Sequence, residues 1–437
     1  MSVLRLPTAD PTRSEWPVGL GGADPETLAQ EFGTPFYVYD LDAVRGQVEA
    51  LRAVMPPSFD LAYAVKANPA LAVVGYLGSL GLGADVASGG ELELTERAGI
   101  EPKDVVFTGP GKRDGELTAA VRAGMRAVTV ESPGELARLE AISAGLGRRT
   151  PILLRAAVGP ATRLERVRLV GDDGAGKFGM DGESLVDGAV RAGRSSHLDL
   201  LGLHAFGASN VLDADALAEH IEHTVSAARS LASRVGFQLR LVDVGGGLGI
   251  PYQPHEEALD LTRLGDRLRT LHDSLAADPL TRATRVLLEP GRFLVGVAGA
   301  YVARVVDRKA VGPSTVVILD GGIHNVLRPA LVGLEHRLQV LTAADGHRAE
   351  RPRAVTIAGP LCSGLDVFIR DSIMVPPAVG DLVAVLDVGA YGFTEAMPFF
   401  LSHPIPAEVA VMAGRAELIR PRVEPRSWLD SQRLPNW

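Results

Sequence analysis

The chain has 437 residues, enough for two or three folded units with large hydrophobic cores. Its 46% apolar and 22% charged residues are ordinary for a globular protein, and its formal net charge of −9 offers no electrostatic basis for binding nucleic acid. A single cysteine, Cys362, excludes an intrachain disulfide and a Cys-rich zinc site, and this favours a reducing, cytoplasmic location. The longest apolar run, 293–303, is too short to cross a membrane, and the N-terminal residues lack the apolar core of a signal peptide.

Short apolar runs alternate with longer segments of helical spacing from residue 34 to about residue 290. Helices are predicted, for example, at 43–54, 90–98, 114–123 and 133–144. Strands are predicted at 36–39, 61–65, 83–86, 105–108, 127–130, 152–156, 198–204, 239–242 and 284–288. This alternation predicts an α/β domain, and the number of units favours a closed (β/α)8 barrel of the TIM type, in which chemistry gathers where strands end.

The sequence changes after residue 293 to short strand-like runs separated by Gly and Pro. Further strands are predicted at 302–306, 315–319, 353–357, 382–386 and 408–412. We therefore predict three parts: an N-terminal segment at 1–33 that joins the second domain, a barrel at 34–292, and a C-terminal all-β domain at 293–437.

Three local patterns resemble known binding motifs but fit them poorly. The stretch 171–178 follows a P-loop until Phe178, where a Ser or Thr should bind magnesium. The glycines of 174–179 fit a dinucleotide fingerprint, yet no strand leads directly into them, so a glycine-rich loop is the preferred interpretation of both patterns. His220 and His223 lie in a polar helical segment and indicate a solvated face rather than a metal site. No metal is predicted.

The segment 61–69 places Lys66 at the end of an apolar strand. Burial of the lysine stem there would make its amine nucleophilic enough to form a Schiff base, although an ordinary snorkelling lysine is the alternative. Two other strand ends carry anion-binding patterns: the glycine-rich run 243–249, and Glu289 followed by Gly291 and Arg292. Together these features indicate a phosphorylated carbonyl cofactor, and pyridoxal 5'-phosphate (PLP) fits.

At this point the chain resembles the fold-type III PLP-dependent decarboxylases, the group of the diaminopimelate, ornithine and arginine decarboxylases. The matching stretches, in order, are FYVYD (36–40), AVKAN (64–68), GADVASGGEL (83–92), HAFGASN (204–210), DVGGGLG (243–249), EPGR (289–292), RPAL (328–331), GPLC with a later Asp (359–366) and GAYG (389–392). The resemblance implies a PLP-binding barrel with a C-terminal β domain, as in the alanine racemase fold. It also implies a carboxy-lyase that forms a homodimer with shared active sites.

The resemblance also implies roles for individual residues. Lys66 would link to the cofactor, His204 would stack on its ring, and Glu289 would hold the pyridine nitrogen protonated. Cys362, supplied by the partner subunit, would protonate the substrate carbon, so that Lys66, His204 and Cys362 form the catalytic set. Further cofactor contacts are implied for Asp85, Arg155, Ser209, Gly246, Gly247, Gly291, Arg292 and Tyr391, with Glu91 nearby. Substrate contacts are implied for Arg292, Arg328, Ser363, Asp366 and Tyr391.

The sequence departs from diaminopimelate decarboxylases after the cysteine, where Ser363 replaces the glutamate that recognises the distal end of diaminopimelate. His324 and Asn325 occupy the approach that acidic residues take in ornithine-type enzymes. The segments 107–112, 176–180, 356–362 and 389–409 resemble biosynthetic members from siderophore and antibiotic pathways. We therefore expect an L-amino acid conjugated to an acyl carrier protein or to citrate as substrate.

Other readings stay open. Diaminopimelate decarboxylation in lysine biosynthesis is one alternative. A racemase would need a tyrosine in place of the cysteine, which the GPLC motif disfavours. A non-catalytic regulatory homologue is disfavoured because Lys66, Glu289 and Arg292 are all present. Arg163, Arg166 and Arg168 could form a basic surface for an acidic carrier protein, but a solvated loop is the simpler interpretation.

Overall fold

The computed structural model describes residues 21–157, 177–207, 209–333, 335–341 and 350–436. These residues form two compact units. One unit contains the described residues up to Gly46, together with Pro251–Glu257 and the chain from Leu294 onward; the other contains Gln47–Ile250 and Ala258–Phe293. Within the described ranges, no helix has the length and apolarity that a membrane span requires.

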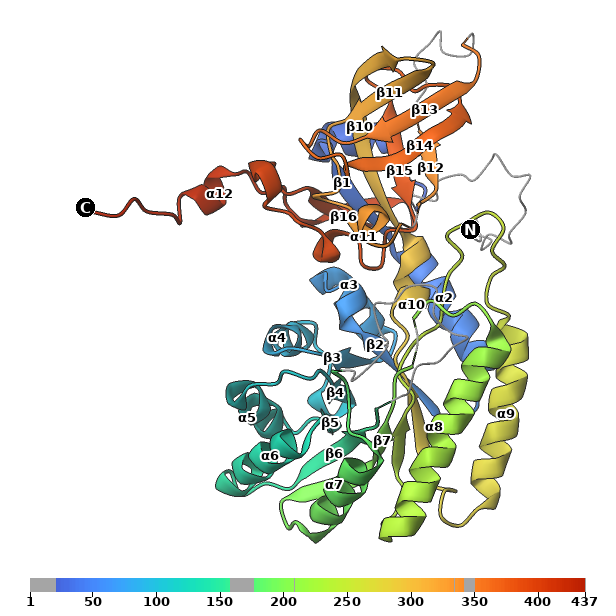
Figure 1. Cartoon of the computed structure of the whole chain (residues 1–437), viewed down its shortest axis with the longest axis vertical. Helices are drawn as coiled ribbons and strands as arrows, with labels where there is room; N and C mark the ends of the chain where they lie inside the picture. The colour runs from blue at the N-terminus through green and yellow to red at the C-terminus, as the bar shows by residue number, and fades with distance from the viewer. Residues whose placement is uncertain (1–20, 158–176, 208, 334, 342–349, 437) are drawn as a thin grey trace. The chain divides into compact units, whose positions relative to one another are not determined.

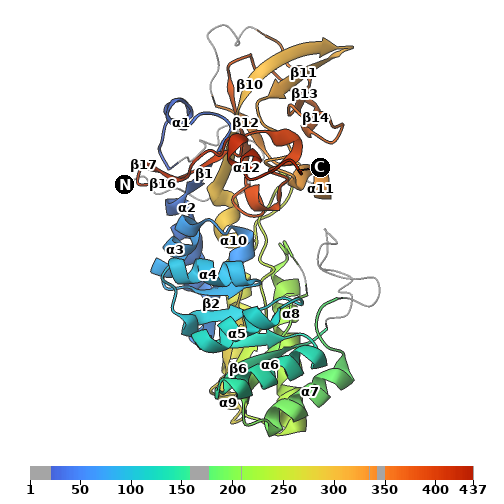
Figure 2. The same ribbon diagram turned by 90° about the vertical axis from the view of Figure 1, so that its left-hand side faces the viewer.

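The second unit is a closed barrel of eight parallel strands, each paired with the next in chain order, and the last paired with the first. Helices surround the strands, and α5, α6 and α7 lie along one side of the barrel (Figures 1 and 2). The strands are β2 (Phe59–Ala64), β3 (Gly83–Val86), β4 (Val105–Phe107), β5 (Ala127–Val130), β6 (Thr150–Arg155), β7 (Leu198–His204), β8 (Leu241–Asp243) and β9 (Arg285–Leu288). The helices are α2 (Leu41–Val54), α3 (Leu71–Ser79), α4 (Gly89–Arg97), α5 (Asp114–Ala123), α6 (Pro133–Gly145), α7 (Gly182–Arg194), α8 (Ala214–Val235), α9 (Leu261–Ala277) and the short α10 (Arg292–Val295). The predicted (β/α)8 barrel is confirmed.

Local sequence explains where these helices begin. Ser88 and Ser132 accept hydrogen bonds at the starts of α4 and α6 from the backbone N–H groups of Glu91 and Glu135. Both glutamates also accept a hydrogen bond from the backbone N–H group of the residue before the capping serine. Both α4 and α6 therefore begin three residues after the preceding strand ends. The barrel interior is closed by small and branched side chains: Ala62, Val106, Ala127, Leu153, Leu241 and Leu287.

The first unit is built on a nine-stranded sheet with the main order β14-β13-β11-β10-β1-β16-β17, while β15 pairs with β10 and β12. Its core includes Leu28 and Ala29 of α1 (Pro25–Phe32), packed with Phe36 and Val38. The strands are β1 (Phe36–Asp40), β10 (Gly299–Val311), β11 (Ser314–Leu319), β12 (Leu338–Val340), β13 (Arg353–Ala358), β14 (Val367–Met374), β15 (Leu382–Leu386), β16 (Ala407–Met412) and β17 (Arg415–Arg420). This unit also contains two short helices: α11 (Arg328–Val332) lies between β11 and β12, and α12 (Arg426–Leu429) follows β17.

One predicted strand belongs to the other unit. The sequence analysis counts 36–39 with the barrel, but β1 pairs antiparallel with β10 and parallel with β16, so it is a central strand of the sheet. All five residues of β1 are buried, as expected for a central strand that is covered on both faces of the sheet. The barrel begins at β2, and the other eight strands predicted before residue 290 are the eight strands that close it.

Candidate active site

Every barrel strand delivers a polar residue at or next to its carboxyl end. Lys66 lies in the 3-10 turn Val65–Ala67 that follows β2, and the other seven residues lie between the next-to-last position of a strand and the first position after it. In a closed parallel barrel these ends meet at one face. We call the eight residues the rim residues: Lys66, Asp85, Thr108, Glu131, Arg155, His204, Asp243 and Glu289. All except Lys66 are buried.

Lys66 is held by Asp85, with 2.7 Å between its Nζ and the Asp85 Oδ2. The other oxygen of Asp85 accepts a hydrogen bond of 2.6 Å from the Thr108 hydroxyl. Burial, together with the charge of Glu289, raises the pKa of Asp85, against the opposing effect of Lys66. The Lys66 side chain is 41% exposed, so the residue as a whole is not buried. The amine is therefore fixed by an ion pair and remains open to a ligand.

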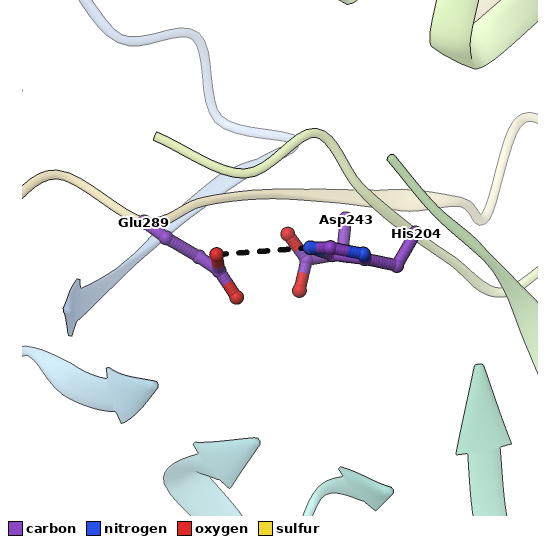
Figure 3. A group of neighbouring side chains, drawn as sticks. All are labelled: His204, Asp243 and Glu289. Carbon is purple, nitrogen blue, oxygen red and sulfur yellow. Dashed lines mark ion pairs between the residues drawn. The ribbon is translucent and has the colours of Figure 1, made fainter. Parts of the chain in front are cut away.

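His204, Asp243 and Glu289 lie together at the ends of β7 and β8 and just after β9 (Figure 3). One side-chain N or O atom from each lies within 4.8 Å of the other two, and the His204 Nε2 is 3.8 Å from the Glu289 Oε2. Burial alone would raise the pKa of Glu289, but His204 and then Lys66 outweigh it and lower that pKa to about 2. Glu289 is therefore an anion at neutral pH. Among the described residues, neither ring nitrogen of His204 has a hydrogen-bond partner, so the buried ring is available to a ligand.

The glycine-rich turn after β8 exposes backbone rather than side chains. Gly245 adopts a φ of 67°, and a Cβ there would lie 2.6 Å from the Phe206 ring. A Cβ at Gly246 would overlap the carbonyl oxygen of Glu289. The carbonyl of Gly247 accepts the Val211 N–H at 2.8 Å, which fixes the turn against the loop after β7. Only glycine fits this approach, and a turn of this kind offers its N–H groups to an anion.

A second anion-binding group follows β9. A Cβ at Gly291 would lie 2.9 Å from that of Ala67, so this backbone passes next to the Lys66 turn. The Arg292 guanidinium is buried and its Nη2 lies 3.5 Å from the Ser209 hydroxyl. Arg292, Ser209 and the glycine turn therefore belong to one side of the barrel opening, as a phosphate group requires.

Arg155 is paired within the barrel. Its Nη1 lies 2.8 Å from the Glu131 Oε1, and its guanidinium lies 4.5 Å from the Phe178 ring centroid. Phe178, which spoils the P-loop pattern, is thus a packing partner of Arg155; residues 171–176 and the three arginines at 163, 166 and 168 lie outside the described residues. Sequence reasoning missed Thr108 and Glu131, whose one signal is their position next to a predicted strand end.

His220 does not lie on a solvated face, as the sequence analysis expected. It is half-buried on α8, where burial lowers its pKa. His223 is exposed. The i, i+3 spacing therefore puts the two rings in different surroundings, and neither is among the residues that gather at the rim.

The other predicted site residues belong to the sheet unit. Arg328 is buried, and its Nη1 lies 2.9 Å from the Glu395 Oε2. Its guanidinium lies 5.5 Å from the ring of Tyr391, a residue with a φ of 55°. Glu395 was missed by sequence reasoning, although it follows the GAYG motif by three residues.

Cys362 is exposed, so its thiol is not packed in the apolar core. The buried Asp366 braces its loop, because its two carboxylate oxygens accept the N–H groups of Ile323 and Leu361, each at 2.7 Å. The Ser363 hydroxyl accepts the N–H of Leu365 at 3.2 Å. The thiol is therefore presented on an ordered turn.

The barrel unit fits PLP on its own geometry. Lys66 offers an accessible amine for the aldehyde, Glu289 offers an anion for the pyridine nitrogen, and the Gly246 turn with Arg292 offers a phosphate cradle. A closed barrel with this set of groups defines a protein that binds a phosphorylated pyridine aldehyde. When bound, PLP acts as an electron sink for a bond broken at the substrate α-carbon.

Comparison with known proteins agrees with this class. Residues 41–296 match the family described as pyridoxal-dependent decarboxylase, pyridoxal binding domain. The chain belongs to this family, and it is a PLP-dependent amino-acid decarboxylase.

Individual relatives differ in their substrates. The chain is 32% identical over 410 residues to the L-glutamyl-[BtrI acyl-carrier protein] decarboxylase of Niallia circulans, covering 92% of this chain and 94% of the relative. It is 34% identical to the diaminopimelate decarboxylase of Aquifex aeolicus, covering 92% of each. The crystal structure of Helicobacter pylori diaminopimelate decarboxylase with L-lysine superposes with a TM-score of 0.83 at 28% identity, covering 93% of this chain and 99% of that one.

Proposed function

We propose that this decarboxylase acts on an L-amino acid whose distal end is conjugated, either carried by an acyl carrier protein or linked to citrate, in specialised metabolism such as siderophore or antibiotic biosynthesis. The observation that carries the proposal is the ion pair between Arg328 and Glu395. A guanidinium already matched by a carboxylate gains little from a second one, so Arg328 is a poor receptor for a free distal carboxylate. Ser363 likewise brings no charge for a distal ammonium. The similarity to an L-glutamyl-[acyl-carrier protein] decarboxylase also supports a conjugated substrate.

In this proposal the rim residues bind and orient the cofactor. Lys66 would hold its aldehyde carbon, His204 would pack against its ring, and Glu289 would keep its nitrogen protonated. Gly246, Gly247, Gly291, Arg292, Ser209 and Tyr391 hold its phosphate, while Asp85 and Arg155 secure the surrounding groups. Lys66 would hold the cofactor until the substrate amine binds, bound PLP would supply the electron sink for the loss of carbon dioxide, and the Cys362 thiol would deliver a proton to the α-carbon.

We also propose a homodimer in which Cys362 serves the active site of the partner subunit. The exposed thiol supports this arrangement. So does a run of exposed apolar side chains on the sheet unit, Met397, Phe399, Phe400 and Leu401, with exposures of 37%, 61%, 40% and 49%. Contiguous exposed apolar residues of this kind mark association surfaces.

The test is carbon dioxide release from the purified protein with added PLP. The panel contains meso-diaminopimelate, lysine, ornithine, arginine, a glutamyl-carrier protein and a citryl-linked diamino acid. We expect turnover only of a conjugated substrate. Rapid turnover of diaminopimelate would favour the second candidate, diaminopimelate decarboxylation, which the 34% identity to the Aquifex enzyme supports. Racemisation without carbon dioxide release would indicate the racemase alternative.

Substitution of Glu395 tests the observation directly. Glu395→Gln removes the partner of Arg328, so we expect the protein to gain recognition of a free carboxylate and the apparent KM for meso-diaminopimelate to fall by about tenfold. Glu417→Gln, an equal change of charge on the exposed face of β17, is the matched control and should leave that KM unchanged. An unchanged KM in Glu395→Gln would remove the main support for a conjugated substrate.

A further inference from the structure

Asp243 is a rim residue to which no motif assigns a role. It is fully buried at the end of β8, and its Oδ1 accepts the N–H of Gly245 at 2.9 Å. Within the described residues, its Oδ2 has no hydrogen-bond donor, and the same is true of the Glu289 Oε1. The donor-free oxygen of Asp243 is costly as a buried carboxylate, and that cost is removed when Asp243 carries a proton and the neighbouring Glu289 carboxylate can accept it.

The charges around Asp243 do not balance if every carboxyl group is ionised. Glu289 faces it from the end of β9 and His204 from the end of β7, while Asp85 acts on it from β3. Lys66 already pairs with Asp85. On the remaining side lies His220 of α8, whose charged form is disfavoured by burial. Three buried carboxyl groups thus share one lysine and one histidine.

The two carboxyl groups of the pair respond in opposite directions. Burial, and then the charge of Glu289, raise the pKa of Asp243 well above its usual value. The pKa of Glu289 is instead lowered to about 2, because His204 and Lys66 outweigh its burial. Glu289 has the His204 Nε2 at 3.8 Å, whereas the one donor to the Asp243 side chain among the described residues is the Gly245 N–H, so a proton shared by these two neighbouring carboxyl groups is placed on Asp243.

We propose that Asp243 is a positioning residue for Glu289: it is a neutral carboxylic acid in the folded protein and donates its O–H to the Glu289 carboxylate. This bond fixes the direction of that carboxylate and keeps it ionised. The inference rests on the proposed role of Glu289 at the cofactor nitrogen. A second anion in the place of Asp243 would compete for the proton that the nitrogen must keep.

Two variants of the PLP-loaded protein distinguish loss of the hydrogen-bond donor at position 243 from loss of the titratable carboxyl group. Asp243→Asn keeps an N–H donor in the same place, whereas Asp243→Leu removes the donor at similar size. In infrared spectra at pH 7, we expect wild type minus Asp243→Asn to show the carbonyl stretch of a protonated carboxylic acid. Asp215→Asn is the control, because Arg263 lowers the pKa of Asp215 and its half-buried carboxylate is already ionised. Absence of the band from the Asp243 difference spectrum would overturn the proposal.

The absorbance spectrum of bound PLP is the second measurement that tests the role of Asp243. We expect Asp243→Asn to retain the wild-type spectrum and its pH dependence, because the donor to Glu289 survives, and Asp243→Leu to change both. Identical changes in the two variants would mean that the donor is irrelevant, which contradicts the proposal.

If Asp243→Leu does not fold, unfolding of wild type and Asp243→Asn carries the test. A raised pKa means that the folded protein retains a proton that the unfolded chain loses, so wild-type stability falls as pH rises above 3.8, the ordinary pKa of Asp. The Asp243→Asn variant lacks this pH-dependent loss of stability. The ratio of its folding equilibrium constant to that of wild type should therefore rise by up to tenfold for each pH unit. Parallel pH profiles would overturn the inference. Silence on every substrate with the infrared band present would instead refute the proposed function alone.

Discussion

His324 is the side chain in the sheet unit whose response to pH is clearest. It is 1% exposed, its ring centroid lies 4.8 Å from that of His403, and its Nδ1 has no hydrogen-bond partner among the described residues. Burial, with His403 adding repulsion, lowers the pKa of His324 to about 4. The folded protein therefore keeps this ring neutral at pH values where the unfolded chain would charge it.

The sign of the effect follows from proton binding. Below pH 6.5 the unfolded chain protonates His324 and the folded protein does not, so the contribution of His324 to stability is complete above pH 6.5 and is lost between 6.5 and 4. We expect His324→Gln to lose less stability than wild type over this interval, as measured by urea midpoints at fixed pH. His223→Gln, on the exposed face of α8, is the control. Equal losses in wild type and His324→Gln would show that the ring is charged when folded.

Single residues also show what the sequence could and could not predict. Four site residues could be predicted because they lie in recognisable motifs: Lys66, His204, Glu289 and Arg292. The structure places all four at the carboxyl end of the barrel. Glu131 stands in no motif. Its pairing with a buried arginine depends on two strands lying side by side, and side-by-side placement is set by closure of the barrel rather than by local sequence.

Among the elements, the glycine turn after β8 gives the sharpest prediction. Gly246→Ala would force a Cβ against the Glu289 carbonyl oxygen, so we expect a loss of about 1–3 kcal/mol in the free energy of unfolding and weaker PLP binding. Gly193→Ala, in open space on α7, should instead stabilise the protein by about 0.5–1 kcal/mol. Denaturant unfolding and PLP titration check both variants. Normal PLP affinity in Gly246→Ala would argue against the turn as a phosphate cradle.

Strand prediction succeeded where burial produces a strong apolar signal and failed where it does not. The barrel strands are short and almost wholly buried. The strands β12, β14 and β17 were missed: β12 has three half-buried residues, and β14 and β17 carry charged side chains along exposed edges of the sheet. Such edge strands are defined by their partners more than by their own composition.

For the whole molecule, the proposed homodimer predicts complementation between two inactive variants. Lys66→Ala and Cys362→Ala each should lower turnover by about 100-fold or more, because one removes the amine and the other the proton donor. When the two are mixed and allowed to exchange subunits, one site of each mixed dimer has both groups, so carbon dioxide release should return. Failure to regain activity, with exchange verified by mass labels, would place both groups in the same subunit's site.

The position of β1 in the sheet has a consequence for synthesis on the ribosome. This strand emerges early, but its neighbours β10 and β16 begin at Gly299 and Ala407. At ~5–20 residues per second, its first partner follows after roughly 10 to 50 s. During that interval the barrel segment can fold vectorially, while five residues destined for the sheet interior wait unpaired. The nascent chain is therefore exposed to misassociation at β1, and a chaperone that shields residues 36–39 until β10 has been synthesised would favour correct pairing of the sheet.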